Sequence, residues 1–268
     1  MPAVDEVDQE RWAIAHANIV GALEVFGTTA VQGEADHSDG VLTFASSRSF
    51  PGPFQIGALR DDASIPAERV IERALEFFGA RSLAFCVWTA PGEDDLIAAA
   101  NGAGFGHAGD APVMVTTRPC AVPDAASGIE LRRLGDDDHE LSMAFASVAD
   151  AAFAEYGQPE GTISDQLTPA FFAHPDVRAT VALVGSEVVA GAMSVAAAGS
   201  VSVHFVATAA GHRREGLGAL VTAVVTNEAF ERGSPQVSLQ ASEMGHSVYA
   251  DLGYAEIGRA SFWFGAPT

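Results

Sequence analysis

The stretch HRREGLGALVTAVV, His212 to Val225, joins a polar turn with two glycines to an apolar, helix-like run. The first backbone N–H groups of a helix have no intrahelical partner, and the positive end of the helix dipole lies behind them. A glycine-rich turn at a helix start therefore predicts a site for an anion such as a phosphate. A surface helix with a basic first turn would use the same residues, so the short pattern leaves both interpretations open.

The chain around this stretch is long and acidic. It has 268 residues, with 35 Asp and Glu against 14 Lys and Arg, and a formal net charge of -21. The length predicts about two domains. The acidic excess disfavours a nucleic-acid partner, because binding a phosphate backbone needs clustered cations. Such charge would attract a cationic amine or a basic peptide, or it serves only to keep the surface soluble.

Targeting and redox signals are absent from the sequence. No apolar run approaches the roughly 20 residues of a membrane span, and the first residues, MPAVDEVDQERW, lack the order of a secretory signal. Cys86 and Cys120 are too few for a disulfide framework and do not have metal-ligand spacing. We expect a cytoplasmic protein with reduced thiols, without a metal and without membrane attachment.

Residue patterns predict an α/β layer with a mixed sheet in the second half. Predicted strands are 129–134, 179–185, 188–197, 201–208, 237–242 and 254–264, and predicted helices are 136–156, 164–174, 215–232 and 245–253. Asp136 is the predicted N-cap of the first helix, and Pro169 is expected to interrupt the second. The order of these elements is typical of strands and helices packed in layers.

A shorter version of the same order is predicted in the first half. Predicted helices are 10–26, 66–79 led by Pro66, and 93–107, and predicted strands are 41–46, 54–59, 82–88 and 112–117. Both halves contain strand, polar bend, helix, glycine and aromatic residue in that order, which indicates an internal duplication. The proline-containing segment 119–128 is the predicted linker between a first domain, 1–118, and a second, 129–268.

The order strand, Arg213, Gly216, Gly218, helix resembles the acetyl-coenzyme A site of the GCN5-related N-acetyltransferases (the GNAT superfamily), whose signature is Q/R-x-x-G-x-G/A. The segments VSLQAS and HSVYADLGY are similar to the next motif of that family, and the resemblance covers about 129–264. A proline common before the arginine is replaced near Ala209. The resemblance implies a tandem of two GNAT-like domains, each a central mixed β-sheet flanked by helices, of which the second is catalytic.

Acetyl-coenzyme A is the cosubstrate that the resemblance implies. Its pyrophosphate would lie on the backbone amides of the glycine turn, and its pantetheine arm would lie beside the preceding strand. The implied binding residues are Val206, Ala207, Thr208, Arg213, Arg214, Glu215, Gly216, Leu217, Gly218, Ala219 and Ser242. At the corresponding place the first half reads RDDASIP, whose carboxylates would repel a phosphate. The first half is therefore expected to be a degenerate GNAT-like domain.

Acetyl transfer to an amine needs a neutral amine and a proton for the leaving thiolate. Tyr249 falls where the family carries its general acid, and a phenol is protonated at neutral pH; a merely packed tyrosine is the alternative. His204, with the strand parity of Ser202 and Val206, is the candidate base, and a hydrogen-bonded core histidine is the alternative. The candidate substrate contacts, in a loop that is otherwise an ordinary polar turn, are Tyr156, Gln158 and Glu160.

The resulting hypothesis is an N-acetyltransferase that acts by direct attack of a primary amine, from a small molecule or a peptide, on acetyl-coenzyme A. The alternative is a catalytically silent module that binds or senses coenzyme A. A Rossmann-type nucleotide domain is disfavoured, because the glycine pattern follows the fourth predicted strand of its half and not the first. The sequence leaves the oligomeric state open, and the final predicted strand, with its SFWF run, is a candidate for pairing in a homodimer.

Overall fold

The computed structural model describes residues 6–48, 50–135, 137–155 and 157–266. Asp136, the predicted N-cap, and Tyr156, a predicted substrate contact, lie outside the described residues. The strands are β1 (Glu34–Ser38), β2 (Val41–Ala45), β3 (Ile56–Arg60), β4 (Phe85–Thr89), β5 (Gly106–Thr116), β6 (Ile129–Arg133), β7 (Val177–Val184), β8 (Glu187–Ala197), β9 (Ser200–Thr208), β10 (Val237–Gln240) and β11 (Ala255–Gly265). The helices are α1 (Glu6–Thr29), α2 (Ala67–Gly79), α3 (Asp94–Gly102), α4 (His139–Ala154), α5 (Pro169–Phe172), α6 (Leu217–Glu231) and α7 (Glu243–Asp251).

The order of elements follows the sequence prediction, with three local differences. β1 was not predicted, because its sequence EADHS is polar and lacks the β-branched residues typical of strands. Pro169 does not interrupt a helix: it stands at the start of α5, where Thr168 accepts a hydrogen bond from the Phe171 N–H at 3.0 Å. A proline fits there because the first turn needs no N–H donor. Pro66 likewise takes the N-cap position of α2, not a place inside its first turn.

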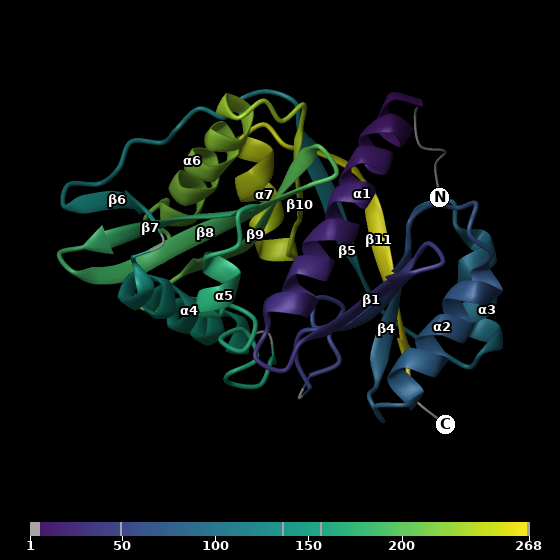
Figure 1. Cartoon of the computed structure of the whole chain (residues 1–268). Helices are drawn as coiled ribbons and strands as arrows, with labels where there is room; N and C mark the ends of the chain where they lie inside the picture. The colour runs from purple at the N-terminus through teal and green to yellow at the C-terminus, as the bar shows by residue number, and fades with distance from the viewer. Residues whose placement is uncertain (1–5, 49, 136, 156, 267–268) are drawn as a thin grey trace.

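The eleven strands form one mixed sheet in the order β1-β2-β3-β4-β11-β5-β10-β9-β8-β7-β6 (Figure 1). The last strand of each half pairs on both edges with strands of the other half. β11 pairs with β4 and β5, and β5 pairs with β10 and β11, all antiparallel. The domain boundary at 119–128 stays a prediction, because the two halves share one sheet. The SFWF run has strand partners on both of its edges, so the expectation that it offers a free edge for a homodimer is wrong.

An approximate twofold axis relates the two halves. β5 and β11 each follow a glycine–aromatic pair, Gly104-Phe105 and Gly253-Tyr254. Ala111 and Ala260 stand at the same position after these pairs, and they face one another in the β5–β11 ladder. A residue that faces its own counterpart across two antiparallel strands marks a twofold axis. This placement supports the internal duplication that the sequence indicated.

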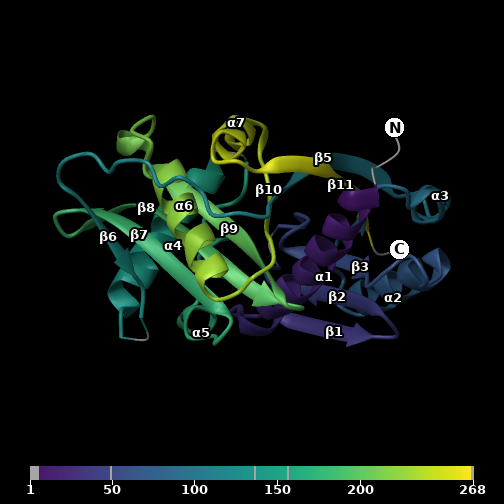
Figure 2. The ribbon, with the colours of Figure 1, turned by 90° about the horizontal axis from the view of Figure 1, so that it is seen from above.

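Helices cover both faces of the sheet (Figure 2). α1, α4 and α5 pack on one face, over a core shared by both halves, whereas α2 and α3 cover the other face of the first half and α6 and α7 that of the second. Among the described helices, none combines the length and apolar character needed to cross a membrane.

α1 lies against the second half although it opens the chain (Figure 1). The Asn18 amide donates hydrogen bonds to the carbonyl oxygens of Val195, Ala197 and Ser200, at 3.3, 3.1 and 2.9 Å. A Cβ at Gly21 would lie 2.6 Å from Ala197 Cβ, so glycine is needed for this close approach. The first helix is thus anchored to the β8–β9 turn.

Candidate functional site

β9 contains a bulge at the point where the sheet opens. In its ladder with β8, Ala207 faces Gly191 and His204 faces Met193, so Phe205 and Val206 together occupy the place opposite one residue. Phe205 has φ +49°, an uncommon conformation for a residue with a side chain. Such a bulge bends a strand and breaks its pairing, and bulges are frequent beside active sites.

The bulge changes which side chains share a face of the sheet. His204 and Phe205 both contact the ring of Phe26 on α1, with centroids 5.2 and 5.5 Å apart. Val206 packs on the opposite face, in the core beneath α6. The predicted common parity of His204 and Val206 is therefore wrong, because the extra residue shifts the alternation by one.

Beyond the bulge, β9 and β10 separate. Their parallel pairing runs from Val201 with Val237 to Val203 with Leu239. β10 ends at Gln240 and leads into α7, whereas β9 continues to Thr208. Among the strands that the structure describes, none pairs with this edge of β9 after Val203. From Phe205 to Thr208 this edge of β9 therefore has no ladder partner among the described strands.

The start of α6 lies next to this open edge. Gly216 takes the N-cap position with φ +79°, no side chain caps the helix, and the Leu220 N–H bonds the Gly216 oxygen at 3.0 Å. The N–H groups of the first turn before Leu220 thus have no helical partner. A Cβ at Gly218 would lie 3.7 Å from Thr208 Oγ1 and 3.9 Å from Val206 Cγ1. The structure therefore brings the glycine turn and the strand of the predicted site together.

The two arginines of the turn differ in their surroundings. The Arg213 guanidinium contacts both carboxylate oxygens of Glu155, at 2.6 and 2.9 Å, and its Nε donates to the Thr208 oxygen at 3.3 Å. This hydrogen bonding lowers the pKa of Glu155. Arg214 is exposed and has φ +65°. Arg213 links the glycine turn to the loop after α4, so part of its charge is already matched inside the protein.

That loop carries the predicted substrate contacts. The Asp150 carboxylate accepts hydrogen bonds from the N–H groups of Gly161 and Ile163, at 2.6 and 2.9 Å, and closes the loop. Gln158 is half-buried, and within the described part of the chain its Oε1 has no hydrogen-bond partner. Glu160 is exposed. The Arg213–Glu155 pair holds this loop beside the opening between β9 and β10.

Tyr249 projects from α7 on the same face of the sheet as α6. Its half-buried ring packs on the core that includes Val206. A Cβ at Gly245 would lie 2.8 Å from Tyr249 Cε2, so glycine makes room for the ring. Ser242, predicted to contact the cofactor arm, caps α7, and its Oγ accepts from the Gly245 N–H at 3.1 Å.

His204 lies in the core. Only 7% of the residue is exposed, its Nε2 lies 2.6 Å from Ser202 Oγ, and burial lowers its pKa to about 3. The imidazole is neutral at pH 7, and its protonated form is too unfavourable for it to take a proton from an amine. The structure supports the alternative interpretation of a packed, hydrogen-bonded histidine.

No family model matches the sequence, and no curated protein matches it. Solved structures do match over most of the chain. A GCN5-related N-acetyltransferase from Kribbella flavida is 21% identical, with 94% of this chain and 96% of that one covered and a TM-score of 0.66. One from Sphaerobacter thermophilus is 14% identical, with 86% and 82% covered and a TM-score of 0.61. A tandem GNAT protein from the clavulanic acid biosynthesis pathway is 14% identical, with 84% and 78% covered and a TM-score of 0.60.

The chain has the tandem GNAT fold. This confirms the predicted fold class, in which β9, α6, β10 and α7 follow one another in the second GNAT-like half. Within the described residues there is no group of three or more His, Cys, Asp or Glu placed to hold a metal ion.

The first GNAT-like half has a salt-bridge network where the second half has an opening. Arg60, at the end of β3, is 1% exposed. Its guanidinium donates to Glu93 Oε1 at 2.7 Å, to both Asp95 oxygens at 2.9 Å, and to the Ile65 oxygen at 2.7 Å. These bonds lower the pKa of Asp95. Pro66 takes the N-cap position of α2, where α6 has Gly216, so this half lacks the one backbone N–H that the N-cap residue would supply.

The sequence analysis identified the acidic loop of the first half, but it did not predict the role of Arg60 at the start of that loop. Glu93 and Asp95 lie far from Arg60 in the sequence, so no local sequence pattern predicts the network.

Both cysteines are buried free thiols, and burial raises the pKa of Cys86 to about 12. A thiol with such a pKa is not a nucleophile at neutral pH.

Proposed function

We propose that the chain is an acetyltransferase that takes an acetyl group from acetyl-coenzyme A and transfers it to a primary amine. One observation carries this proposal: bulged β9 separates from β10 directly in front of the uncapped start of α6. Unpaired N–H groups at a helix start suit a pyrophosphate, and an open strand edge suits an extended chain of amide groups.

The residues of the second half fit the coenzyme. The N–H groups of the α6 first turn, from Gly216 to Ala219, would hold the pyrophosphate, and we call these groups the amide cradle. Val206 to Thr208 would pair with the pantetheine arm. Gly216 meets no atom within 4 Å where a Cβ would stand, so the turn has room for a ligand. When bound, acetyl-coenzyme A supplies the acetyl group as a thioester.

Tyr249 is the proposed proton donor. Its phenol would hydrogen-bond the sulfur as the C–S bond breaks and give its proton to the leaving thiolate. The amine nitrogen forms the new C–N bond and releases its own proton to water. His204 has no part in this scheme, because burial holds it neutral in the core.

The acceptor is proposed to be the amine of a small molecule or a peptide. The net charge of -21 would attract a cationic amine towards the chain before it loses its proton. Gln158 and Glu160, beside the opening, are the proposed contacts. A cytoplasmic location and a homodimer stay predictions.

A second candidate function is a silent module that binds coenzyme A. The Arg60 network favours it, because one half of this chain has side-chain salt bridges at the corresponding place and still keeps the fold. Calorimetric titration with coenzyme A, together with an assay of thiol release over a panel of amines, separates the two. Binding with release supports the enzyme, binding without release supports the silent module, and no binding refutes the site.

A further inference from the structure

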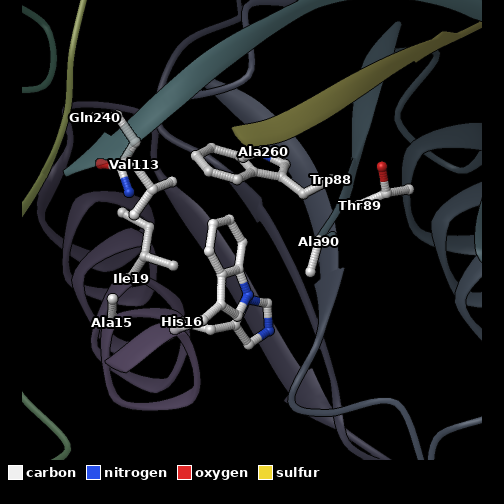
Figure 3. A pocket seen from close by; sticks show the side chains of 10 residues that line it. Ala15, His16, Ile19, Trp88, Thr89, Ala90, Val113, Gln240 and Ala260 are labelled. Atoms are coloured by element: carbon white, nitrogen blue, oxygen red, sulfur yellow. The ribbon is translucent and has the colours of Figure 1, made fainter. Parts of the chain in front are cut away.

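Helix α1 is the part of the first half that reaches the loop after α4. Figure 3 shows His16 and Ile19 of α1 beside Trp88 and Val113 of the sheet, around a cavity of only about 20 Å³. Since one water molecule needs roughly 10–15 Å³ of such space, the helix is closely packed on the sheet. Together with the hydrogen bonds of Asn18 to the β8–β9 turn, this packing fixes α1 relative to the second half.

The loop after α4 is bonded to the end of α1. We call residues 157–168 the acceptor loop, because the proposed amine contacts lie in it. The Val31 N–H, just after α1, donates to the Asp165 oxygen at 3.0 Å. The Thr168 hydroxyl donates to the oxygen of Thr29, the last residue of α1, at 2.8 Å. Two hydrogen bonds thus join the last part of the acceptor loop to the first half.

The buried amide of Gln166 makes a third connection to the first half. Gln166 is 0% exposed. Its Nε2 donates to Ser46 Oγ and, at 2.9 Å, to the Phe54 oxygen, and its Oε1 accepts from Gln55 Nε2 at 3.2 Å. All three partners lie between β2 and β3. An amide side chain has two N–H donors and one carbonyl acceptor, and Gln166 uses both kinds, so its partners define where it lies.

Hydrogen bonds inside the acceptor loop connect Gln166 with the proposed amine contacts. The Gln166 N–H donates to the Ile163 oxygen at 3.0 Å. The Asp150 carboxylate on α4 accepts from the N–H groups of Ile163 and Gly161. Gly161 directly follows Glu160, one of the proposed contacts. The position of Gln166 therefore affects the position of Glu160.

We propose that Gln166 is a positioning residue for acetyl transfer: through it the first half sets the place of the acceptor loop, and so the affinity for the amine. This proposal rests on the proposed function and gives the first half a part in acceptor binding. The side-chain partners of Gln166 belong to the first half, whereas the amide cradle is on α6 and the unpaired strand edge is on β9. Coenzyme binding should therefore not depend on Gln166.

The kinetic test uses Gln166→Met, which keeps the length of the side chain and removes its hydrogen bonds. KM for the fastest-reacting amine of the panel should rise about tenfold, because small displacements of substrate-positioning groups are costly. A loss of amine binding alone changes KM more than kcat, and the calorimetric affinity for coenzyme A should stay within a few fold. If Gln166→Met leaves KM for the amine unchanged, the proposal is overturned.

Asn18→Leu is the matched control. It removes another buried amide that joins the two halves, but this amide bonds the β8–β9 turn and not the acceptor loop. The control should lower thermal stability, because hydrogen bonds to three carbonyl groups are lost. Its KM for the amine should stay unchanged. A rise in KM equal to that of Gln166→Met would show that any weakening of the contact between the halves has this effect, and it would overturn the specific role of Gln166.

A double variant separates positioning from stability. Gln166→Met leaves the buried Gln55 amide without its Gln166 partner, which is destabilising. Adding Gln55→Met removes that amide as well, and the Ser46 hydroxyl lies within hydrogen-bond distance of the Phe54 and Gln55 oxygens, at 3.3 and 3.1 Å. Stability should return towards that of the unchanged chain, whereas KM should stay high. A KM that returns together with the stability shows a structural role only and overturns the proposal.

Hydrogen exchange distinguishes a failure of this proposal from a failure of the proposed function, because it needs no substrate. The N–H groups of Ile163 and Leu167 are bonded within the acceptor loop, to Asp150 and to the Ile163 oxygen. They should exchange several-fold faster in Gln166→Met and in the double variant, and at the unchanged rate in Asn18→Leu. If the unchanged chain transfers no acetyl group, the proposed function fails, and faster exchange still supports the hold of the first half on the loop. Unaltered exchange overturns that hold.

Discussion

The change Gly218→Asp tests the cradle directly. A side chain at Gly218 has room, since its Cβ would make ordinary contacts at 3.7 Å with Thr208 Oγ1 and 3.9 Å with Val206 Cγ1. The fold should therefore accept the variant. Asp in the first turn of α6 adds about 0.3–1 kcal/mol of helix-dipole stabilisation, and the loss of a helical glycine adds roughly 0.5–1 kcal/mol. Thermal stability is expected to stay level or rise.

The affinity for coenzyme A should fall in the Gly218→Asp variant, although its stability is kept. A carboxylate about 4 Å from a phosphate charge costs about 4 kcal/mol at the effective dielectric constant of about 20 that applies near a protein surface. At about 1.4 kcal/mol per tenfold, the affinity for coenzyme A should fall at least a hundredfold. Isothermal titration calorimetry measures this loss, and thermal unfolding of the same samples checks the fold.

Two control variants make this test specific. Gly218→Ala adds the Cβ without the charge and should keep the affinity within a few fold. In the first half, Glu68 already stands at the second position of α2, where α6 has Gly218. Glu68→Gln should leave coenzyme affinity unchanged. If Gly218→Asp binds coenzyme A as tightly as the unchanged chain, the pyrophosphate does not lie on α6 and the site assignment is wrong.

Three further predictions test the proposed proton donor, the packing of α1 and the pH dependence of stability. Tyr249→Phe should lower kcat by about a hundredfold or more while the calorimetric affinity for coenzyme A stays the same, and an unchanged rate would remove Tyr249 from the mechanism. Gly21→Val should lower the free energy of unfolding in urea by about 1–3 kcal/mol, because its Cβ would overlap Ala197, whereas Gly79→Ala, with no atom within 4 Å, should not. Burial opposes charge on His37, yet the hydrogen bonds that its ring donates to Asp61 and Glu24 raise its pKa. The stabilisation by His37 should be complete below about pH 6.5, the unfolded value, and fade as pH rises through the higher folded value. His37→Gln should remove this part of the pH dependence of unfolding, and an unaltered profile would contradict the assignment.

Local patterns predicted most of the fold. The apolar spacing of α2, the apolar run of α6, the glycines that follow α3 and α7, and the short apolar runs of β7 and β8 depend on neighbours in the sequence, and they give the elements directly. Strand order could not be predicted in this way. β11 is paired on both edges by strands of the first half, and nothing within its own sequence distinguishes β4 from β10 as a partner.

The site was predicted where it depends on backbone and missed where it depends on tertiary packing. Gly216 and Gly218 predict the amide cradle from the sequence, because glycine is the residue type that such a turn requires. The bulge at Phe205 has no comparable signal, since its positive φ is imposed by the surrounding sheet. The prediction assumed that side chains alternate without interruption along β9, and it therefore placed His204 and Val206 on the same face. The bulge puts them on opposite faces.

The first half completes the sheet and the core of the second half. Its strand β5 covers the edge of β10 that faces away from β9, and an uncovered strand edge invites pairing with other chains. Its helix α1 supplies Phe26 against His204 and Trp12 against the cavity beside Gln240. The Arg60 network gives the first half internal salt bridges near the start of α2, the helix that corresponds to α6. The second half packs against a strand and a helix of the first half, so the first half contributes to the structure around the proposed site without needing a ligand of its own.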